Sequence, residues 1–215
     1  DNGWKSCGWS VWSDISDVEG LTSNSLNDIT YPATYYMIYK RTITYKYGYQ
    51  GSQSVTGDQY CSYDIRNPKG VTVPTISASS DLPGWTYKGM ALDTSSTVYG
   101  AGTSAEFSAR DSATYYAVYE KDFTINYLNG ASDASQVSGT TSSDTITAGY
   151  FSKGTTCLFK VDGKYVDKKA LKAKIYERNG YNFSSWKTAT GKTINGGSSA
   201  LLDELNITPK QTASS

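Results

Sequence analysis

Five carboxylic acids are the strongest candidates for catalysis in this 215-residue chain: Asp14, Asp17, Glu19, Asp203 and Glu204. Two carboxylates that face one another can hydrolyse a glycosidic bond, one as general acid and one as nucleophile or base. These acids lie in the two end portions of the chain, in loop-like sequence, and the chain has no histidine to activate a serine or cysteine nucleophile. The sequence therefore predicts that the protein is not an enzyme.

Metal and cofactor chemistry is poorly supported as well. The segment Asp14–Glu19 offers fewer oxygen ligands than a calcium loop needs. Cys7, Cys61 and Cys157 are too few and too irregular for a disulfide framework, and without a Cys-x-x-Cys pair or a histidine they do not form a zinc motif. Asn195–Ser198 precedes no helix and is interpreted as a turn rather than a phosphate loop. We expect no metal and no cofactor.

Binding is the chemistry that remains. Trp12 has no counterpart in the repeated segments described below, which makes it a candidate for an exposed aromatic contact. Lysines gather between Lys160 and Lys174, although the chain as a whole has zero net charge. They lack the interleaved aromatics of a nucleic-acid module, so we interpret them as a solvated face and expect no nucleic-acid partner. The candidate ligand contacts are Trp12, Tyr165, Lys168 and Lys172.

The elements that must position such contacts are strands, because the sequence repeats a tyrosine-rich segment. Ala33–Tyr47 recurs as Ala113–Tyr127, 80 residues later. Odd positions in both copies are mostly aromatic or aliphatic, whereas even positions become polar after Ile38 and Val118. This period of two predicts half-buried β-strands. Self-similarity at a fixed spacing also favours an array of like modules over a single reaction centre.

A second marker follows the pattern Gly, aromatic, three variable residues, small residue, large apolar residue. It occurs as Gly3–Trp9, Gly84–Met90 and Gly180–Trp186. Gly8 and Gly89 hold the small position, where we predict close approach or a positive φ. The large residues that end the three copies are predicted to fill the core.

The two markers together divide the chain into three parts. We predict the C-terminal half of a first repeat at 1–40, a complete repeat at 41–120, and a third repeat at 121–215 that lacks its last strand. The joints fall at Lys40–Arg41 and Glu120–Lys121, where polarity changes inside the tyrosine-rich segments. We expect one strand to pass through each joint, so that it closes one unit and opens the next.

The third part carries an insertion of 16 residues, because Tyr127 to Gly180 spans 53 residues where Tyr47 to Gly84 spans 37. Val161–Tyr165 contains an Asp-Gly pair, which predicts a tight hairpin. From Asp167 as N-cap to the Asn179-Gly180 stop, the spacing predicts the one short helix of the chain.

These motifs resemble the Listeria–Bacteroides repeat, also called the internalin B-repeat family. The resemblance rests on the element Gly3–Trp9, the strand Tyr115–Tyr119 and the segment Phe123–Gly130, and it covers most of the chain. Tyr39 and Tyr119 depart from it, since the family often has Trp there. The resemblance implies small β-grasp-like modules with a short helix, a place in secreted or surface proteins of bacteria or their phages, and no catalytic residues.

The expected fold class is therefore mostly β (α+β), with tandem β-grasp-like modules in an elongated array. We expect an extracellular location at a cell surface or phage particle, without membrane insertion, since no long apolar run is present. The expected function is a structural and adhesive repeat module of a bacterial surface protein, a stalk that displays binding sites for protein or glycan. The alternatives are a phage fibre or decoration protein and a carbohydrate-binding module of a larger hydrolase. Copies of the chain itself, or a larger parent chain, are further expected partners.

Overall fold

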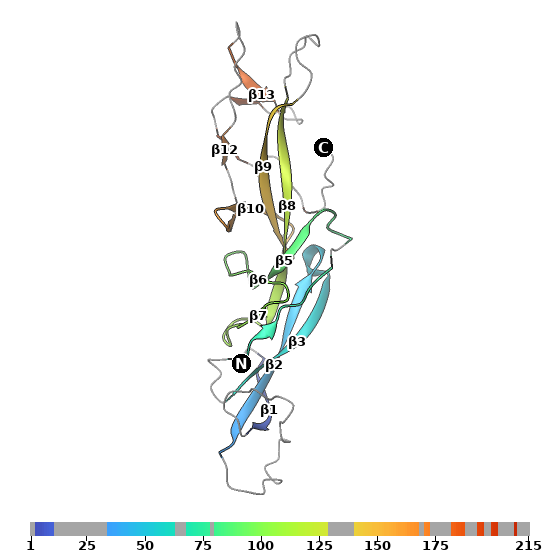
Figure 1. Cartoon of the computed structure of the whole chain (residues 1–215), viewed down its shortest axis with the longest axis vertical. Coiled ribbons are helices and arrows are strands. Elements are labelled where there is room, and N and C mark those ends of the chain that lie inside the picture. Colours follow the sequence, from blue (N-terminus) through green and yellow to red (C-terminus); the bar gives the residue numbers. More distant parts are fainter. Residues whose placement is uncertain are drawn as a thin grey trace. The chain divides into compact units, whose positions relative to one another are not determined.

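The computed structural model describes residues 3–10, 34–62, 68–77, 80–128, 140–167, 170–172, 182–187, 193–195, 199–201 and 209. These residues form a mostly β protein with one large mixed sheet and small two-stranded sheets, which confirms the coarse fold class (Figure 1). The strands are β1 (Lys5–Ser10), β2 (Tyr36–Tyr47), β3 (Gln53–Cys61), β4 (Val71–Thr72), β5 (Thr86–Ala91), β6 (Tyr99–Gly100), β7 (Ser104–Ala105), β8 (Thr114–Leu128), β9 (Thr140–Phe151), β10 (Cys157–Val161), β11 (Lys164–Val166), β12 (Ala170–Lys172), β13 (Ser185–Lys187), β14 (Thr193–Asn195) and β15 (Ser199–Leu201).

The chain divides into two compact units. The first comprises Asp1–Glu120 with Phe151–Thr155, and the second comprises Lys121–Tyr150 with Thr156–Ser215. Separate β-grasp-like modules are not evident among the described strands. Among all the described residues, the only helical element is the 3-10 turn η2 (Tyr49–Gly51). No described helix is therefore long enough to cross a membrane.

The first unit is organised around β2, a long strand with different partners at its two ends. β1 runs antiparallel to its beginning, with Ser6 opposite Tyr39 and Gly8 opposite Ile38. β3 runs antiparallel from Tyr39 to Tyr47 and lies beside β2 in Figure 1. The end of β2 also pairs in parallel with the beginning of β8. The strand predicted over the joint at Lys40–Arg41 is thus confirmed as one unbroken element.

The second tyrosine-rich segment repeats this arrangement within the same unit. β5 runs antiparallel to β8, with Tyr87 opposite Tyr119 and Gly89 opposite Val118. In both pairs the register shifts by one residue just before the glycine, so Cys7 and Lys88 occupy equivalent β-bulges. Gly8 and Gly89 have φ of 152° and 150°, which confirms the predicted positive φ.

Burial along β2 follows the alternation of its sequence. Arg41, Ile43 and Tyr45 face inward, while Thr42 is exposed between them. Ile38 is buried on the other face, where it packs with Cys61. The predicted half-buried strand is confirmed, because the buried side chains from Arg41 to Tyr45 alternate with less buried ones.

Aromatic rings form much of the core of the first unit. The rings of Phe107 and Tyr115 stack with centroids 3.8 Å apart, and Tyr99 meets Phe107 edge-on at 5.0 Å. Tyr45 adds a tilted contact with Phe107 at 6.2 Å. Met90, predicted to fill the core, is fully buried. Offset and edge-on ring pairs stabilise the core of a fold. Packing of this kind therefore explains the abundance of tyrosine.

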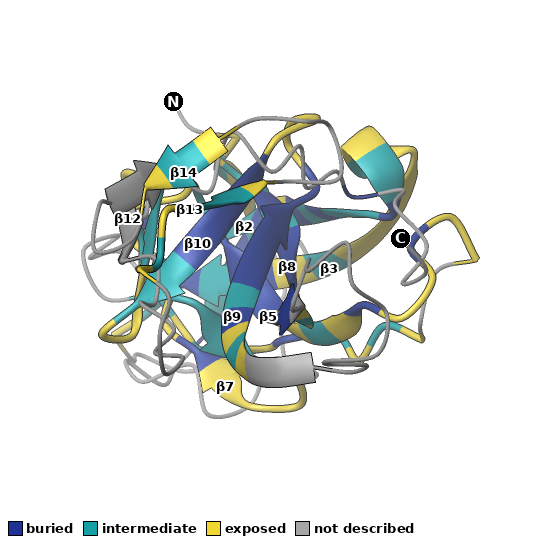
Figure 2. Ribbon diagram, turned by 90° about the horizontal axis from the view of Figure 1, so that it is seen from above, coloured by how far each residue is buried: buried dark blue, intermediate teal, exposed yellow. Residues whose placement is uncertain are grey.

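The second unit contains the end of β8, then β9, β10 and β11 in that order. The predicted Asp-Gly hairpin is confirmed: Val161 lies opposite Lys164, and Asp162 and Gly163 both have positive φ, as a type I′ turn requires. Ile146 and Phe159 form the core of this unit together with Phe123, Ile125 and Val166. Figure 2 shows the buried residues as dark blue stretches of β9 and β10.

The predicted helix from Asp167 to Gly180 is wrong where the structure describes it. Ala170–Lys172 forms β12, which pairs antiparallel with β15. The N-cap and spacing are local signals, and hydrogen bonds to a distant strand override them. Residues 168–169 and 173–180 lie outside the described residues.

The third copy of the glycine marker also behaves differently from the first two. Its described part, β13, pairs with β14, so that Trp186 lies opposite Ile194 rather than opposite a tyrosine-rich strand. Trp186 is half-buried and meets Tyr127 edge-on at 4.9 Å. Trp9, in the first copy, is half-buried too. Among the residues predicted to fill the core, only Met90 is completely enclosed in the described structure.

Candidate functional site

A groove of about 290 Å³ lies in the first unit between β3 and the segment that leads into β4. The residues that line it are Gly57, Asp58 and Tyr60 of β3, Lys69–Thr72, and Tyr45 of β2. The volume is at the lower end of the range of small-molecule sites. This groove is the candidate functional site.

Hydrogen bonds hold the two walls together at one end. The backbone N–H of Lys69 donates to the Tyr60 carbonyl at 2.7 Å, and the Gln59 side-chain amide donates to the Lys69 carbonyl at 3.3 Å. β4 then continues into antiparallel pairing with β7. A Cβ at Gly70 would stand 2.5 Å from Ser104 Oγ, so only glycine lets the segment approach this closely. The wall opposite β3 is therefore fixed in place.

Tyr45, one of the residues that line the groove, has a buried phenol. The Tyr45 side chain is 2% exposed, and within the described residues its hydroxyl has no partner. Burial raises the pKa of Tyr45 to about 12. A Cβ at Gly57 would stand 3.4 Å from Tyr45 Cε2 and 3.8 Å from its hydroxyl oxygen, so the backbone of Gly57 lies close to this ring. The hydroxyl can donate one hydrogen bond and accept others.

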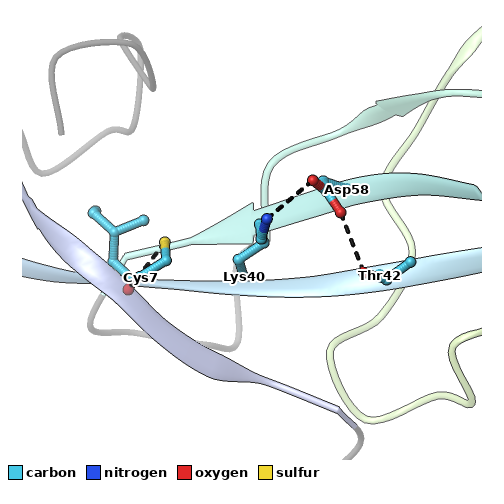
Figure 3. Close-up of polar contacts among 5 residues, drawn as sticks. Cys7, Lys40, Thr42 and Asp58 are labelled. Carbon is cyan, nitrogen blue, oxygen red and sulfur yellow. Dashed lines mark hydrogen bonds and ion pairs between the residues drawn. The ribbon is translucent and has the colours of Figure 1, made fainter.

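Asp58 carries its carboxylate on the face of the β2–β3 pair opposite to Tyr45, because it pairs with the exposed Thr42. Its Oδ2 accepts a hydrogen bond and ion pair from Lys40 Nζ at 3.2 Å, and its Oδ1 accepts from the Thr42 hydroxyl at 3.3 Å (Figure 3). The hydrogen bond to Asp58 raises the pKa of Lys40. Because a carboxylate has about four acceptor sites, Asp58 can accept further hydrogen bonds from a ligand.

Cys7 is drawn beside these residues in Figure 3, but its thiol is not activated. Its Sγ donates to the Ile38 carbonyl at 3.5 Å. Burial raises the pKa of Cys7, and the nearby Lys40 offsets this only in part. Burial raises the pKa of Cys157 to about 12. Since the thiolate is the reactive form, neither sulfur is prepared for nucleophilic chemistry. The three cysteines form no disulfide.

On the inward face of β2, Arg41 forms a buried polar clamp. Its side chain is 1% exposed, and its Nε donates to Gln59 Oε1 at 2.9 Å. The remaining N–H groups donate to three backbone carbonyls of the loop before β8, those of Ser108 at 2.8 Å, Asp111 at 3.0 Å and Ala109 at 3.4 Å. Trp4 covers the guanidinium, whose carbon lies 4.9 Å from the ring centroid. The clamp joins β2, β3 and the loop, and it fixes the strand that carries the groove.

Burial lowers the pKa of Arg41, while Tyr115 and Asp111 act in the opposite direction. An arginine starts so far above neutral pH that it stays charged. The charge is satisfied by carbonyl dipoles and the Gln59 amide rather than by a carboxylate. This role is structural, because the guanidinium is buried and donates its hydrogen bonds to groups of the protein itself.

The residues proposed from the sequence as ligand contacts are not brought together by the described structure. Trp12 and Lys168 lie outside the described residues, as do the five candidate acids. Lys172 lies in β12, and its side chain is not described. Tyr165 lies in β11, half-buried, and its ring covers Gly149 so closely that a Cβ there would overlap it. The roles of these residues in binding stay predictions.

Sequence reasoning missed the groove itself. Gly57 and Gly70 were the available signal, because a glycine in or beside a strand often marks a close approach or an open space. Neither belongs to the repeated motifs, and they become neighbours only through the fold. Within the described residues, no group of three or more Cys, Asp or Glu side chains is arranged to hold a metal.

Comparison with known proteins adds no assignment. No family model, curated protein or solved structure matches the chain. The resemblance to the Listeria–Bacteroides repeat therefore stays a prediction based on the quoted motifs.

Proposed function

We propose that this chain is a non-catalytic structural and adhesive repeat module of an extracellular bacterial surface protein, where it acts as a stalk and displays binding sites. In this proposal the two strand pairs are related units of a tandem array, and the tyrosine-rich strands join one unit to the next. The Listeria–Bacteroides resemblance points to the same setting.

One observation carries the proposal: the pair β1–β2 recurs as β5–β8 with the same register, bulge and glycine conformation. A repeated pair of this kind is expected in an array, in which each unit buries its apolar face against its neighbour. The joints favour a stalk because β2 runs unbroken through Lys40–Arg41 and β8 through Glu120–Lys121. A strand in a hydrogen-bonded ladder is stiffer than a flexible linker.

The chemistry of the described polar groups also favours a structural role. The Tyr119 hydroxyl accepts from the Gly48 N–H at 3.2 Å, and the Tyr87 hydroxyl donates to the Pro74 carbonyl at 2.9 Å. Asp93 accepts from Ser95 and Ser96 in a turn, and these hydrogen bonds lower its pKa to about 2. These groups stabilise the fold and are not arranged as a nucleophile with its base.

The direct test is immunogold electron microscopy with antibodies against the purified chain. Whole cells of the organism that encodes it and purified phage particles from the same culture would be labelled side by side. We expect gold particles on the outer face of the cells. Label confined to fibres or capsids would replace the cell-surface assignment with the phage alternative, and label found only inside sectioned cells would refute an extracellular role.

The stalk can be tested separately by pulling single molecules from their two ends. We expect Arg41→Met to lower the unfolding force, because the clamp joins β2 to β3 and to the loop before β8. Arg110→Met is the matched control, since Arg110 is an exposed arginine in the same loop. Equal forces for the wild type and both variants would show that this region does not resist unfolding under force, which would contradict the stalk.

A further inference from the structure

Two strands of the large sheet each have one edge that no described strand covers. Along residues 36–38, the start of β2 pairs with β1 alone among the described strands, because β3 begins to pair at Tyr39 and β8 at Thr44. Along residues 121–128, the end of β8 has β9 as its only described strand partner, because β5 and β2 pair with β8 no further than Glu120. An edge of this kind can pair with another strand.

The fold itself contains one example of how two such edges meet. The end of β2 and the beginning of β8 pair in parallel, with Thr44 opposite Thr114 and Tyr45 opposite Tyr115. The Thr44 N–H donates to the Ala113 carbonyl at 2.7 Å. This short parallel ladder lies within the first unit and shows which edge of each long strand accepts the other.

The uncovered edges carry threonines at the equivalent positions. Because the tyrosine-rich segment recurs after 80 residues, Thr34 corresponds to Thr114, and Thr124 corresponds to Thr44. The two threonines of the parallel ladder are half-buried, whereas Thr34 and Thr124 are both exposed. The copies that have a strand beside them are thus more buried than the copies that do not.

The next position along each strand shows the same difference. In the parallel ladder Tyr45 is 2% exposed and Tyr115 is 1% exposed. Their counterparts Ile125 and Tyr35 are only half-buried. Both uncovered edges therefore still have apolar surface to bury, and burial of apolar surface is the main driving force for association.

We propose that the start of β2 in one copy of this chain pairs in parallel with the end of β8 in a second copy, with Thr34 opposite Thr124. Charge favours this occupant, because residues 1–40 contain two Lys or Arg against five Asp or Glu, while residues 121–215 contain twelve against eight. Such a head-to-tail contact leaves one edge of each kind at the ends, so further copies can add to a filament. The inference rests on the stalk part of the proposed function and names a partner for it.

Sedimentation velocity of the full chain at a series of protein concentrations tests the assembly. We expect the average sedimentation coefficient to rise with concentration. Added salt should lower it again, because salt screens the attraction between ends of opposite charge. A single monomeric species at every concentration would overturn the proposal. That result would leave the stalk assignment intact, because the stalk is tested by labelling and by force.

Thiol cross-linking tests the register. Thr34→Cys protein is mixed with Thr124→Cys protein and treated with a short bismaleimide. We expect more cross-linked dimer in the mixture than in either variant alone, which gives the background from the half-buried Cys7. Thr34→Cys mixed with Thr42→Cys is the matched control, since Thr42 is an exposed threonine of β2 outside the proposed contact. Equal cross-linking in the two mixtures would refute this register.

Charges at the same two positions give a matched pair of double variants. Thr34→Lys with Thr124→Lys places like charges opposite each other across the strand pair, and Thr34→Lys with Thr124→Glu places opposite charges there. We expect the first to associate about 2- to 5-fold more weakly than the wild type, and the second at least as strongly as the wild type. Equal affinities of the two double variants would place the contact elsewhere and refute the proposal.

Discussion

The strand pairs β1–β2 and β5–β8 have the same backbone pairing but different side-chain chemistry. In the second pair Tyr119 and Met90 are fully buried, whereas their counterparts Tyr39 and Trp9 are half-buried. β5 also pairs with β6 on its second edge, which encloses it further. The pairing therefore does not depend on how completely the aromatic positions are buried.

The ion pairs also differ between the two strand pairs, although the backbone pairing is the same. In the first pair the long strand supplies the cation, and Lys40 meets Asp58 of β3 at 3.2 Å. In the second pair the equivalent position is Glu120, which meets Lys88 of the β5 bulge at 3.6 Å. The charges are exchanged, yet the register is unchanged. What the two pairs share is the glycine after the bulge and the alternation of the long strand.

We expect alkaline pH to have the largest effect on the free energy of unfolding. In the second strand pair, Tyr87 and Tyr119 are responsible for this effect. Burial raises the pKa of both and that of Tyr115. It raises the pKa of Tyr45 to about 12. The folded protein keeps these protons, while the unfolded chain releases them above about pH 10. The free energy of unfolding should therefore fall with rising pH above about 10, by roughly 1.4 kcal/mol per pH unit for each such tyrosine.

Urea unfolding at a series of pH values from 8 to the onset of alkaline denaturation measures this slope. Tyr87→Phe should make the fall of the unfolding free energy with pH shallower by the contribution of one tyrosine, roughly 1.4 kcal/mol per pH unit. An identical slope in the variant would show that Tyr87 ionises as readily in the folded protein as in the unfolded chain, which would contradict its burial in the second pair.

The first pair should depend most on Arg41. Arg41→Met removes the donor for Gln59 and for the loop carbonyls, and buried acceptors without partners are costly, so we expect a loss of about 3 kcal/mol or more. Chemical denaturation followed by tryptophan fluorescence measures it. Arg110→Met should change stability by less than about 0.5 kcal/mol, as exposed positions usually do. Similar losses in the two variants would refute the clamp.

The two bulge glycines allow a direct comparison of the pairs. Gly89→Ala should be the more harmful change, because a Cβ there would overlap the Tyr99 carbonyl oxygen in addition to requiring a positive φ. We expect about 3 kcal/mol for Gly89→Ala, against about 1–2 kcal/mol for the φ strain at Gly8. Thermal denaturation of the two variants gives the order, and a reversed order would show that β6 does not confine the second pair.

The exchanged ion pairs should have the smallest effect. Both cations are well exposed, with 41% of the Lys40 side chain and 44% of that of Lys88 accessible, so solvent screens them. Lys40→Met and Lys88→Met should each leave the urea midpoint within experimental error. A clear loss in only one of them would reveal an asymmetry between the pairs that their geometry does not predict.

Local signals predicted a good part of this fold. The alternation along Ala33–Tyr47 and Ala113–Tyr127 predicted β2 and β8, since a period of two is enough to define a half-buried strand. Asp162-Gly163 predicted a hairpin whose turn depends only on positive φ at two residues. Gly8 and Gly89 were predicted for the same reason. In each case the information lies within a few neighbouring residues.

The failures involve residues that are distant in sequence. The helical pattern after Asp167 includes Ala170–Lys172, which instead pairs with β15. The groove needs Tyr45, Gly57 and Lys69–Thr72 together, and no motif connects them. Arg41 belonged to the inward-facing set of its strand, yet its partners in the loop Ser108–Asp111 could not be read from that pattern.

Local sequence patterns were enough to predict that this protein is built from strands, where two of the long strands run and where glycine is required. Those properties follow from side-chain alternation and from backbone conformations that only glycine adopts easily. Only the tertiary structure shows which strands pair, which tyrosine hydroxyls lack a partner among the described residues and which segments line the groove. These depend on hydrogen bonds and packing between residues far apart in the chain, and such contacts leave no periodic trace in a single sequence.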